Sequence, residues 1–237
     1  MSRVARGLSL VAGGAVPAQV RPAERRSGSN LGGHWRLPQS PQATLSELFA
    51  VHPRDCGWTG FLLAQLDTAK PLLWVQERMA ILESGRIHPP GLPTQELIHV
   101  EARDARDALW AMEEGLRCAA LSCVIGEIWG DPRALDFTAT RRLAVASERS
   151  GVPCWLVRLG GTANLSGARM RWRLASAPSL INDLDPKAPG LPAWNVELFR
   201  ARRHPTGTWL VCHDPHSFHL VAQSGDRALA EDERLRA

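Results

Sequence analysis

The chain has 237 residues, carries 28 Lys or Arg against 24 Asp or Glu, and is 44% hydrophobic. This balance is typical of a folded globular protein and excludes an intrinsically disordered chain. No apolar run approaches the roughly 20 residues that cross a bilayer, so an integral membrane protein is excluded as well. All cations except Lys70 and Lys187 are arginine, which binds phosphate in a bidentate manner, but a net charge of +4 is mild and does not decide for nucleic acid.

The five cysteines are scattered and form no Cys-x-x-Cys pair. An odd number without such pairs indicates neither a disulfide framework nor a zinc ribbon. We therefore expect a cytoplasmic protein without a metal site.

The chain divides into three parts by composition. Residues 1–43 are rich in Gly and Pro, show no sustained apolar period, and are expected to form a flexible N-terminal arm. Residues 44–222 contain the apolar segments of one folded domain, and residues 223–237 form a charged C-terminal tail.

The first predicted element is a strand near Leu45 and Leu48, followed by a turn rich in Pro and Gly and then by a helix. Four further short apolar runs are bounded by polar or turn residues and are typical of buried strands. These runs are "PLLWVQE", "ELIHVEA", "LSCVIGEI" and "CWLVRL".

An amphipathic helix is predicted over residues 104–118, because apolar residues recur there at helical spacing. The residues that carry this period are Leu109, Met112 and Leu116. Most tryptophans are expected on core faces, among them Trp74, Trp110 and Trp155.

A second helix is predicted over residues 136–150. Asp136 and Thr138 are both candidate N-caps, and Gly151 is placed to end the helix before Pro153. Buried strands that alternate with helices of about a dozen residues indicate repeated β-α-β units, hence a parallel sheet covered on both faces.

The pattern changes after Gly167, where Arg169, Arg171 and Arg173 alternate with apolar residues. A strict period of two predicts a half-exposed strand. The segments "AWNVELFRARR", "TWLVCH" and "FHLVA", separated by turns, then predict an antiparallel meander.

The first strand-turn-helix is where an α/β nucleotide-binding protein carries Gly-x-x-x-x-Gly-Lys followed by Ser or Thr. Over His52 to Thr59, only Gly57 and Thr59 match this pattern, and Trp58 replaces the lysine. A tryptophan cannot bridge the β and γ phosphates as the lysine ammonium does. An ordinary strand-to-helix turn with Gly57 at its bend explains these residues more simply.

From about Leu45 to Val221 the chain resembles a RecA-type ATPase core and, more closely, the ImuA family of RecA-like accessory proteins of bacterial damage-induced mutagenesis. Four segments carry the resemblance, in order and at family-like spacing. They are "LLWVQE", "ALWAMEEGLRCAALSCVIGEI", "LDFTATRRLAVASERSGVPCWLVR" and "WNVELFRARRHPTGTWLV". The resemblance implies an α/β fold: a RecA-like P-loop-type core with a mainly parallel central sheet and helices on both faces, followed by a C-terminal antiparallel β-meander.

The resemblance also identifies a vestigial nucleotide site of Gly57, Trp58, Thr59 and Glu77. Glu77 stands where RecA proteins place a glutamate that activates water, and Gly126 stands where an aspartate would organise magnesium. Only the candidate base is kept, so we expect no hydrolysis and no required cofactor, while binding of ATP stays open. A local capping or pairing role explains Glu77 equally well.

Filament-style DNA binding is not expected, because the two loops that would carry it, "IWGDPRALD" and "LGGTANLSG", are short and the second has no cation. The candidate DNA-binding residues are instead arginines of the late strands, Arg169, Arg171, Arg173, Arg200, Arg202 and Arg203. A solvated strand edge is the slightly favoured alternative, because no aromatic residues alternate with the arginines for base stacking.

The resemblance implies a non-catalytic accessory or scaffold protein in SOS-induced error-prone translesion DNA synthesis. Its implied partners are ImuB and the error-prone DNA polymerase III alpha-type subunit, with RecA and DNA as further candidates and no membrane partner. Two alternatives stay open: a functional DNA-dependent RecA-type ATPase, and a cell division inhibitor of the SOS response similar to SulA.

Overall fold

The computed structural model describes residues 38, 42–66, 70–92, 96–182, 185, 187–213 and 218–220. All of these belong to the unit that spans residues 32–237. Of the expected N-terminal arm, only residues 38, 42 and 43 are described, and the expected tail 223–237 lies outside the described residues.

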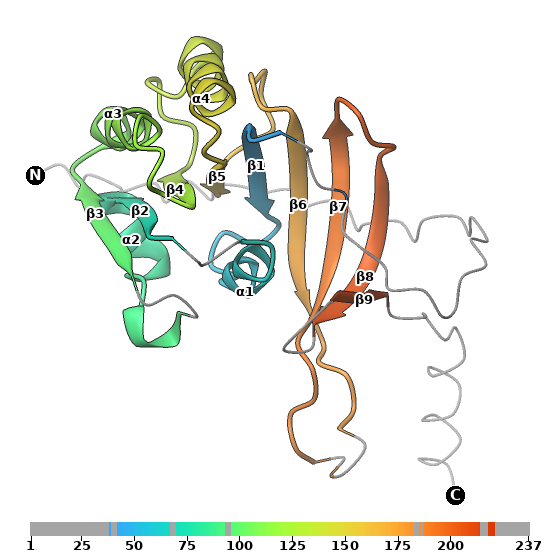
Figure 1. The fold of residues 1–237 in the computed structure, drawn as a ribbon. Helices are drawn as coiled ribbons and strands as arrows, with labels where there is room; N and C mark the ends of the chain where they lie inside the picture. The colour runs from blue at the N-terminus through green and yellow to red at the C-terminus, as the bar shows by residue number, and fades with distance from the viewer. Residues whose placement is uncertain are drawn as a thin grey trace, which may run out of the picture. The chain divides into compact units, whose positions relative to one another are not determined.

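A nine-stranded sheet in the order β3-β2-β4-β5-β1-β6-β7-β8-β9 organises the described part of the chain (Figure 1). Neighbouring strands from β3 to β6 are parallel, and those from β6 to β9 are antiparallel. The α/β class, the mainly parallel sheet and the C-terminal antiparallel meander are therefore confirmed. The strands are β1 (Leu45–Ala50), β2 (Leu72–Glu77), β3 (Leu97–Ala102), β4 (Cys123–Trp129), β5 (Cys154–Leu159), β6 (Met170–Ala177), β7 (Ala193–Ala201), β8 (Gly207–His213) and β9 (Phe218–Leu220).

Helices cover both faces of the parallel part of the sheet (Figure 1). Helices α1 (Trp58–Leu63) and α2 (Arg78–Ser84) pack on one face, and α3 (Ala105–Gly115) and α4 (Phe137–Ser150) pack on the other. The short helix α2 has no counterpart among the elements that the sequence predicts. None of the helices described by the structure combines the length and apolar character needed to cross a bilayer.

Both long helices begin at an aspartate whose side chain caps the first turn. Asp104 accepts a hydrogen bond from the amide of Asp107 at 3.0 Å, and Asp136 accepts one from the amide of Ala139 at 2.7 Å. Gly151 follows α4 in the left-handed conformation, with φ of 76°, which a residue with a Cβ adopts only at a cost. The predicted start and end of α4 are confirmed.

Two layers of apolar side chains form the core, one on each face of the sheet. The α1 face is aromatic, with Trp58, Phe61, Trp74, Trp172 and Trp194 in one cluster. The α3 and α4 face is aliphatic and includes the three residues whose period predicted α3.

One tryptophan departs from the expectation of burial. Trp110 on α3 is 64% exposed, because its place in the helical period points it away from the stripe of Leu109, Met112 and Leu116 that packs on the sheet. The prediction that Trp110 lies on a core face is wrong.

Candidate functional site

The turn between β1 and α1, where a phosphate loop would lie, is bonded to the protein's own groups. The Asp55 carboxylate accepts hydrogen bonds from the amide of Gly57 at 2.9 Å, from the Ser176 hydroxyl at 2.5 Å and from the Ser176 amide at 2.7 Å. Burial opposes ionisation of this carboxyl, but the hydrogen bonds outweigh it and lower the pKa of Asp55. The turn amide that would face a phosphate is thus already bonded to an anion.

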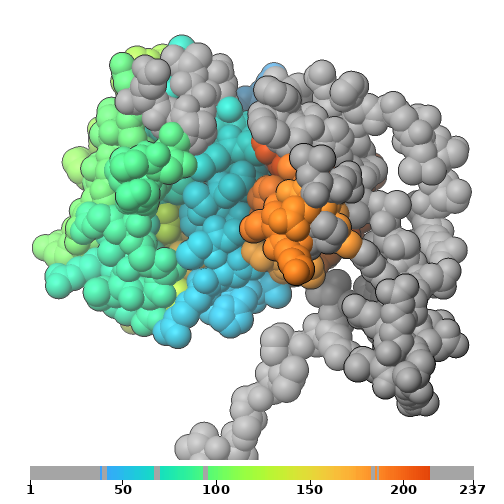
Figure 2. All heavy atoms as spheres, turned by 90° about the horizontal axis from the view of Figure 1, so that it is seen from below, coloured from blue at the N-terminus to red at the C-terminus, as the bar shows by residue number. Residues whose placement is uncertain are grey.

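The space in front of Gly57 is also filled. A Cβ at this position would lie 2.1 Å from the Ser176 Oγ, and the Gly57 carbonyl accepts a hydrogen bond from the Trp194 indole at 2.8 Å. Figure 2 looks onto this end of the sheet, where atoms of the β1–α1 segment lie between those of the green β2–α2–β3 segment and the orange β6–β7 connection. The structure therefore shows a strand-to-helix turn closed by β6 and β7.

Trp58, which replaces the phosphate-binding lysine, is the first residue of α1 and is buried in the core. Its ring packs against that of Trp74 with centroids 6.1 Å apart. Thr59 is half-buried, and its amide donates to the carbonyl of Cys56. Trp58 thus serves the core and Thr59 the first turn of the helix.

Glu77 does not meet the Gly57–Thr59 turn. Along β2 it shares a face with Val75, which packs with α3 and α4, whereas Trp58 lies in the cluster on the opposite face. Its carboxylate accepts a hydrogen bond from the Trp129 amide at 2.8 Å. Burial raises the pKa of Glu77 although this hydrogen bond opposes the rise. These contacts agree with the alternative explanation of Glu77, in which its carboxylate caps neighbouring backbone groups.

A second buried carboxylate lies on the α1 face and was not identified from the sequence. Glu127 of β4 accepts hydrogen bonds from the Trp74 indole at 2.5 Å and from the Gln76 amide group at 3.1 Å. Burial raises its pKa to about 7. The sequence could have indicated this burial, because alternate residues of a strand share one face and Glu127 alternates with the core residues Cys123 and Ile125.

Gly126, which replaces the magnesium-organising aspartate of the resemblance, faces α3. A Cβ there would lie 2.1 Å from the Met112 Sδ. Close packing of α3 on β4 is thus the physical reason for glycine at this position. Among the described residues, no group of three or more His, Cys, Asp or Glu side chains is arranged to hold a metal ion.

Strand β6 carries Arg171 and Arg173, and Arg169 directly precedes it. Because β6 is an interior strand between β1 and β7, the prediction of a solvated strand edge is wrong. Arg171 is only 3% exposed and donates to Glu47 at 2.6 Å. Arg169 pairs with Glu148 at 2.6 Å, and Arg173 pairs with Glu197. Each of these three arginines is thus neutralised by a carboxylate from another element.

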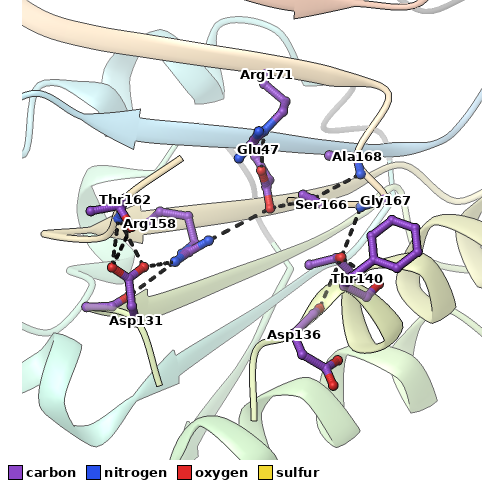
Figure 3. Close-up of polar contacts among 12 residues, drawn as sticks. Glu47, Asp131, Asp136, Thr140, Arg158, Thr162, Ser166, Gly167, Ala168 and Arg171 are labelled. Atoms are coloured by element: carbon purple, nitrogen blue, oxygen red, sulfur yellow. Dashed lines mark hydrogen bonds and ion pairs between the residues drawn. The ribbon is translucent and has the colours of Figure 1, made fainter. Parts of the chain in front are cut away.

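A buried polar network surrounds Glu47 (Figure 3). One carboxylate oxygen accepts from the Ser166 hydroxyl at 2.8 Å and lies 3.9 Å from a nitrogen of Arg158, and the other oxygen bonds Arg171. Arg158 in turn pairs with Asp131 at 2.5 Å. Two guanidinium groups therefore face two carboxylates, and the network is electrically balanced and structural in character.

Phenylalanine rings from neighbouring strands lie between these arginines. The Arg171 guanidinium carbon is 5.2 Å from the ring centres of both Phe49 and Phe199, and that of Arg173 is 4.7 Å from Phe199. The prediction that no aromatic residues are interleaved with the arginines is wrong, because strands β1 and β7 supply them. The rings are already in cation–π contact, which stabilises the sheet.

Arg200, Arg202 and Arg203 lie at the end of β7 and in the turn that follows, and all three are exposed. They form no ion pair with any residue that the structure describes. The six candidate arginines thus separate into three that form ion pairs, Arg169 just before β6 and Arg171 and Arg173 on it, and three at the end of β7 and beyond that form none among the described residues.

No family model matches the sequence. The protein is 33% identical over 180 residues to Protein ImuA of Caulobacter vibrioides strain NA1000 / CB15N, and equally to Protein ImuA of strain ATCC 19089 / CIP 103742 / CB 15. The similarity covers 70% of this chain and 71% of each relative. On this evidence the chain belongs to the ImuA family.

Proposed function

We propose that the protein is a non-catalytic, RecA-like accessory protein that acts as a scaffold in SOS-induced error-prone translesion DNA synthesis in the cytoplasm. The proposal is supported by the resemblance to RecA-type cores and by membership of the ImuA family. The observation that carries its non-catalytic part is the closed β1–α1 turn, in which Asp55 and Ser176 take up the Gly57 amide.

Hydrolysis of ATP needs backbone amides around the phosphates, a cation on the outer phosphate and a positioned base. In this protein the turn amide is bonded to Asp55, Trp58 belongs to the core, and Glu77 lies on the other face of the sheet. The place of β1 between two parallel neighbours, β5 and β6, with its turn at their carboxyl ends, supports descent from a nucleotide-binding core.

Thermal melting and phosphate release test the non-catalytic part. We expect no rise in Tm with magnesium and ATP, because only a ligand that binds the folded state stabilises it. Phosphate release should stay at the background level of a Glu77→Gln variant. Release that Glu77→Gln abolishes would contradict the proposal and favour the ATPase alternative.

Co-purification from cells treated with a DNA-damaging agent tests the scaffold part. We expect the tagged protein to retain ImuB and the error-prone DNA polymerase III alpha-type subunit, with RecA as a further candidate. Retention of the tubulin-like division ring protein in their place would favour the division inhibitor.

A further inference from the structure

A basic cleft of about 390 Å³ opens between the start of α4, the segment that precedes β6, and the end of β7. Its charged lining is formed by Arg141, Arg169, Arg200 and Arg202, and Phe137 also lines it. The volume falls within the range that protein sites use for small ligands, so the cleft can accept a unit of nucleotide size.

The charge of this cleft is not balanced by its lining. No carboxylate lines it, and Arg169 is the only lining arginine with an ion pair among the described residues, through Glu148. Arg141, Arg200 and Arg202 have no such partner and are exposed. Arg202 shares the charge of Glu148 with Arg169, so four guanidinium groups around one hollow face a single carboxylate, and this excess of positive charge favours an anionic ligand.

A smaller hollow of about 50 Å³ continues this positive surface. It shares Arg169 and Arg202 with the cleft and adds Arg203 and His204, and its one carboxylate is that of Glu148, the partner of Arg169. The cations therefore follow a path along the molecule, as a chain of phosphates requires.

Close backbone packing fixes the wall of the cleft. A Cβ at Gly167 would lie 2.6 Å from the Arg141 Cα, and the Gly167 amide donates to the Thr140 hydroxyl at 3.0 Å. The Thr140 hydroxyl and the loop that carries Gly167 lie beside the Glu47 network in Figure 3. The position of Arg141 relative to β6 is thus set by the main chain.

We propose that this cleft binds single-stranded nucleic acid, with Arg141, Arg200 and Arg202 on the phosphates and Phe137 stacked on a base. Phe137 is 40% exposed and lines the cleft, so part of its side chain is accessible for contact with a base. An acidic peptide would use the arginines but would gain nothing from the aromatic face. The site includes a helix residue that sequence analysis did not single out, and it does not depend on the scaffold function proposed above.

Fluorescence anisotropy of a labelled single-stranded oligodeoxynucleotide, titrated over a range of salt concentrations, tests this site. We expect the slope of log K against log salt to become shallower by about 0.7 for each of Arg141→Gln, Arg200→Gln and Arg202→Gln. The matched control is Arg142→Gln, because Arg142 is the next residue of α4 but pairs with Glu113 at 3.0 Å. This control should leave the slope unchanged.

Phe137→Ala separates nucleic acid from other polyanions. It should weaken binding of the oligodeoxynucleotide by about tenfold while leaving the affinity for inorganic polyphosphate unchanged. Melting curves verify that each variant is folded. The proposal would be overturned if the oligodeoxynucleotide did not bind at low salt, or if Arg141→Gln and Arg142→Gln gave the same slope. It would also be overturned if polyglutamate bound as tightly as the oligodeoxynucleotide and lost affinity with the same arginine substitutions.

Discussion

Two buried carboxylates on opposite faces of the sheet are stabilised in different ways. Glu47 is held by Arg171 and Arg158, so its charge is matched by cations. Among the described residues, Glu127 accepts hydrogen bonds from two neutral donors, Trp74 and Gln76, and pairs with no cation. Desolvation therefore dominates at Glu127, and its pKa rises to about 7.

Glu127 is expected to make the folded state less stable as the pH rises. The folded pKa is raised above the unfolded value, so the folded state binds the proton more tightly. The stabilisation is complete below pH of about 4.5 and is lost as the pH rises to about 7. Glu127→Gln, which mimics the protonated form, should remove this dependence and be more stable than the parent by about 2–3 kcal/mol at pH 8.

Urea denaturation of the parent and the Glu127→Gln variant at pH 5 and pH 8 measures this difference. A difference between the two proteins that is the same at both pH values would refute the assignment of the titration to Glu127.

The pair of Arg171 and Glu47 is expected to contribute far more to stability than the neighbouring pair of Arg169 and Glu148. Arg171→Met leaves Glu47 short of a buried cation, which costs about 3–5 kcal/mol. Arg169→Met breaks a half-exposed pair that solvent screens, which costs about 0–1 kcal/mol. Equal losses in chemical denaturation would contradict the buried network.

At the scale of the element, the start of α4 illustrates how the structure decides between two residues that the sequence leaves equivalent. Asp136 and Thr138 both suit an N-cap, but only Asp136 bonds the free amide of Ala139. Thr138 already lies in the first turn and is exposed.

Asp136→Ala should therefore destabilise the protein by about 1 kcal/mol, because the first turn of α4 loses a hydrogen-bond acceptor. Thr138→Ala is the matched control and should change stability by less than about 0.5 kcal/mol. Thermal or urea unfolding of both variants gives the comparison, and a larger loss for Thr138→Ala would be inconsistent with the observed cap.

At the scale of the whole molecule, the Asp55 and Ser176 contact joins the turn after β1 to the end of β6, 121 residues further along the chain. The antiparallel meander is thus bonded to the turn that, in a nucleotide-binding core, would be free for phosphate. The turn is therefore closed because the meander, through Ser176 of β6, packs against it.

A double-mutant cycle at Gly57 and Ser176 measures this connection. Gly57→Ala requires the Ser176 hydroxyl to move and should cost about 1–3 kcal/mol, since φ at Gly57 is −60° and adds no strain. Ser176→Ala should cost about 1 kcal/mol through its lost hydrogen bond. In the Ser176→Ala background, Gly57→Ala should cost less than it does alone, whereas additive effects would show that the contact does not form.

The sequence by itself determined the local features of this protein. The helical period of Leu109, Met112 and Leu116 and the end of α4 at Gly151 depend on neighbours within a few residues, so pattern alone predicts them, whereas it leaves both Asp136 and Thr138 open as the cap of α4. The loss of the phosphate-binding lysine at Trp58 is likewise read directly from the chain.

Only the tertiary structure decided what the arginines of β6 do. Alternation along a strand is the same for an edge strand and for an interior one, so it cannot reveal that β6 lies between β1 and β7. The carboxylate that neutralises Arg171 lies 124 residues away, and the two phenylalanines come from neighbouring strands. Strand pairing brings these groups together, and it depends on long-range contacts that no local period encodes.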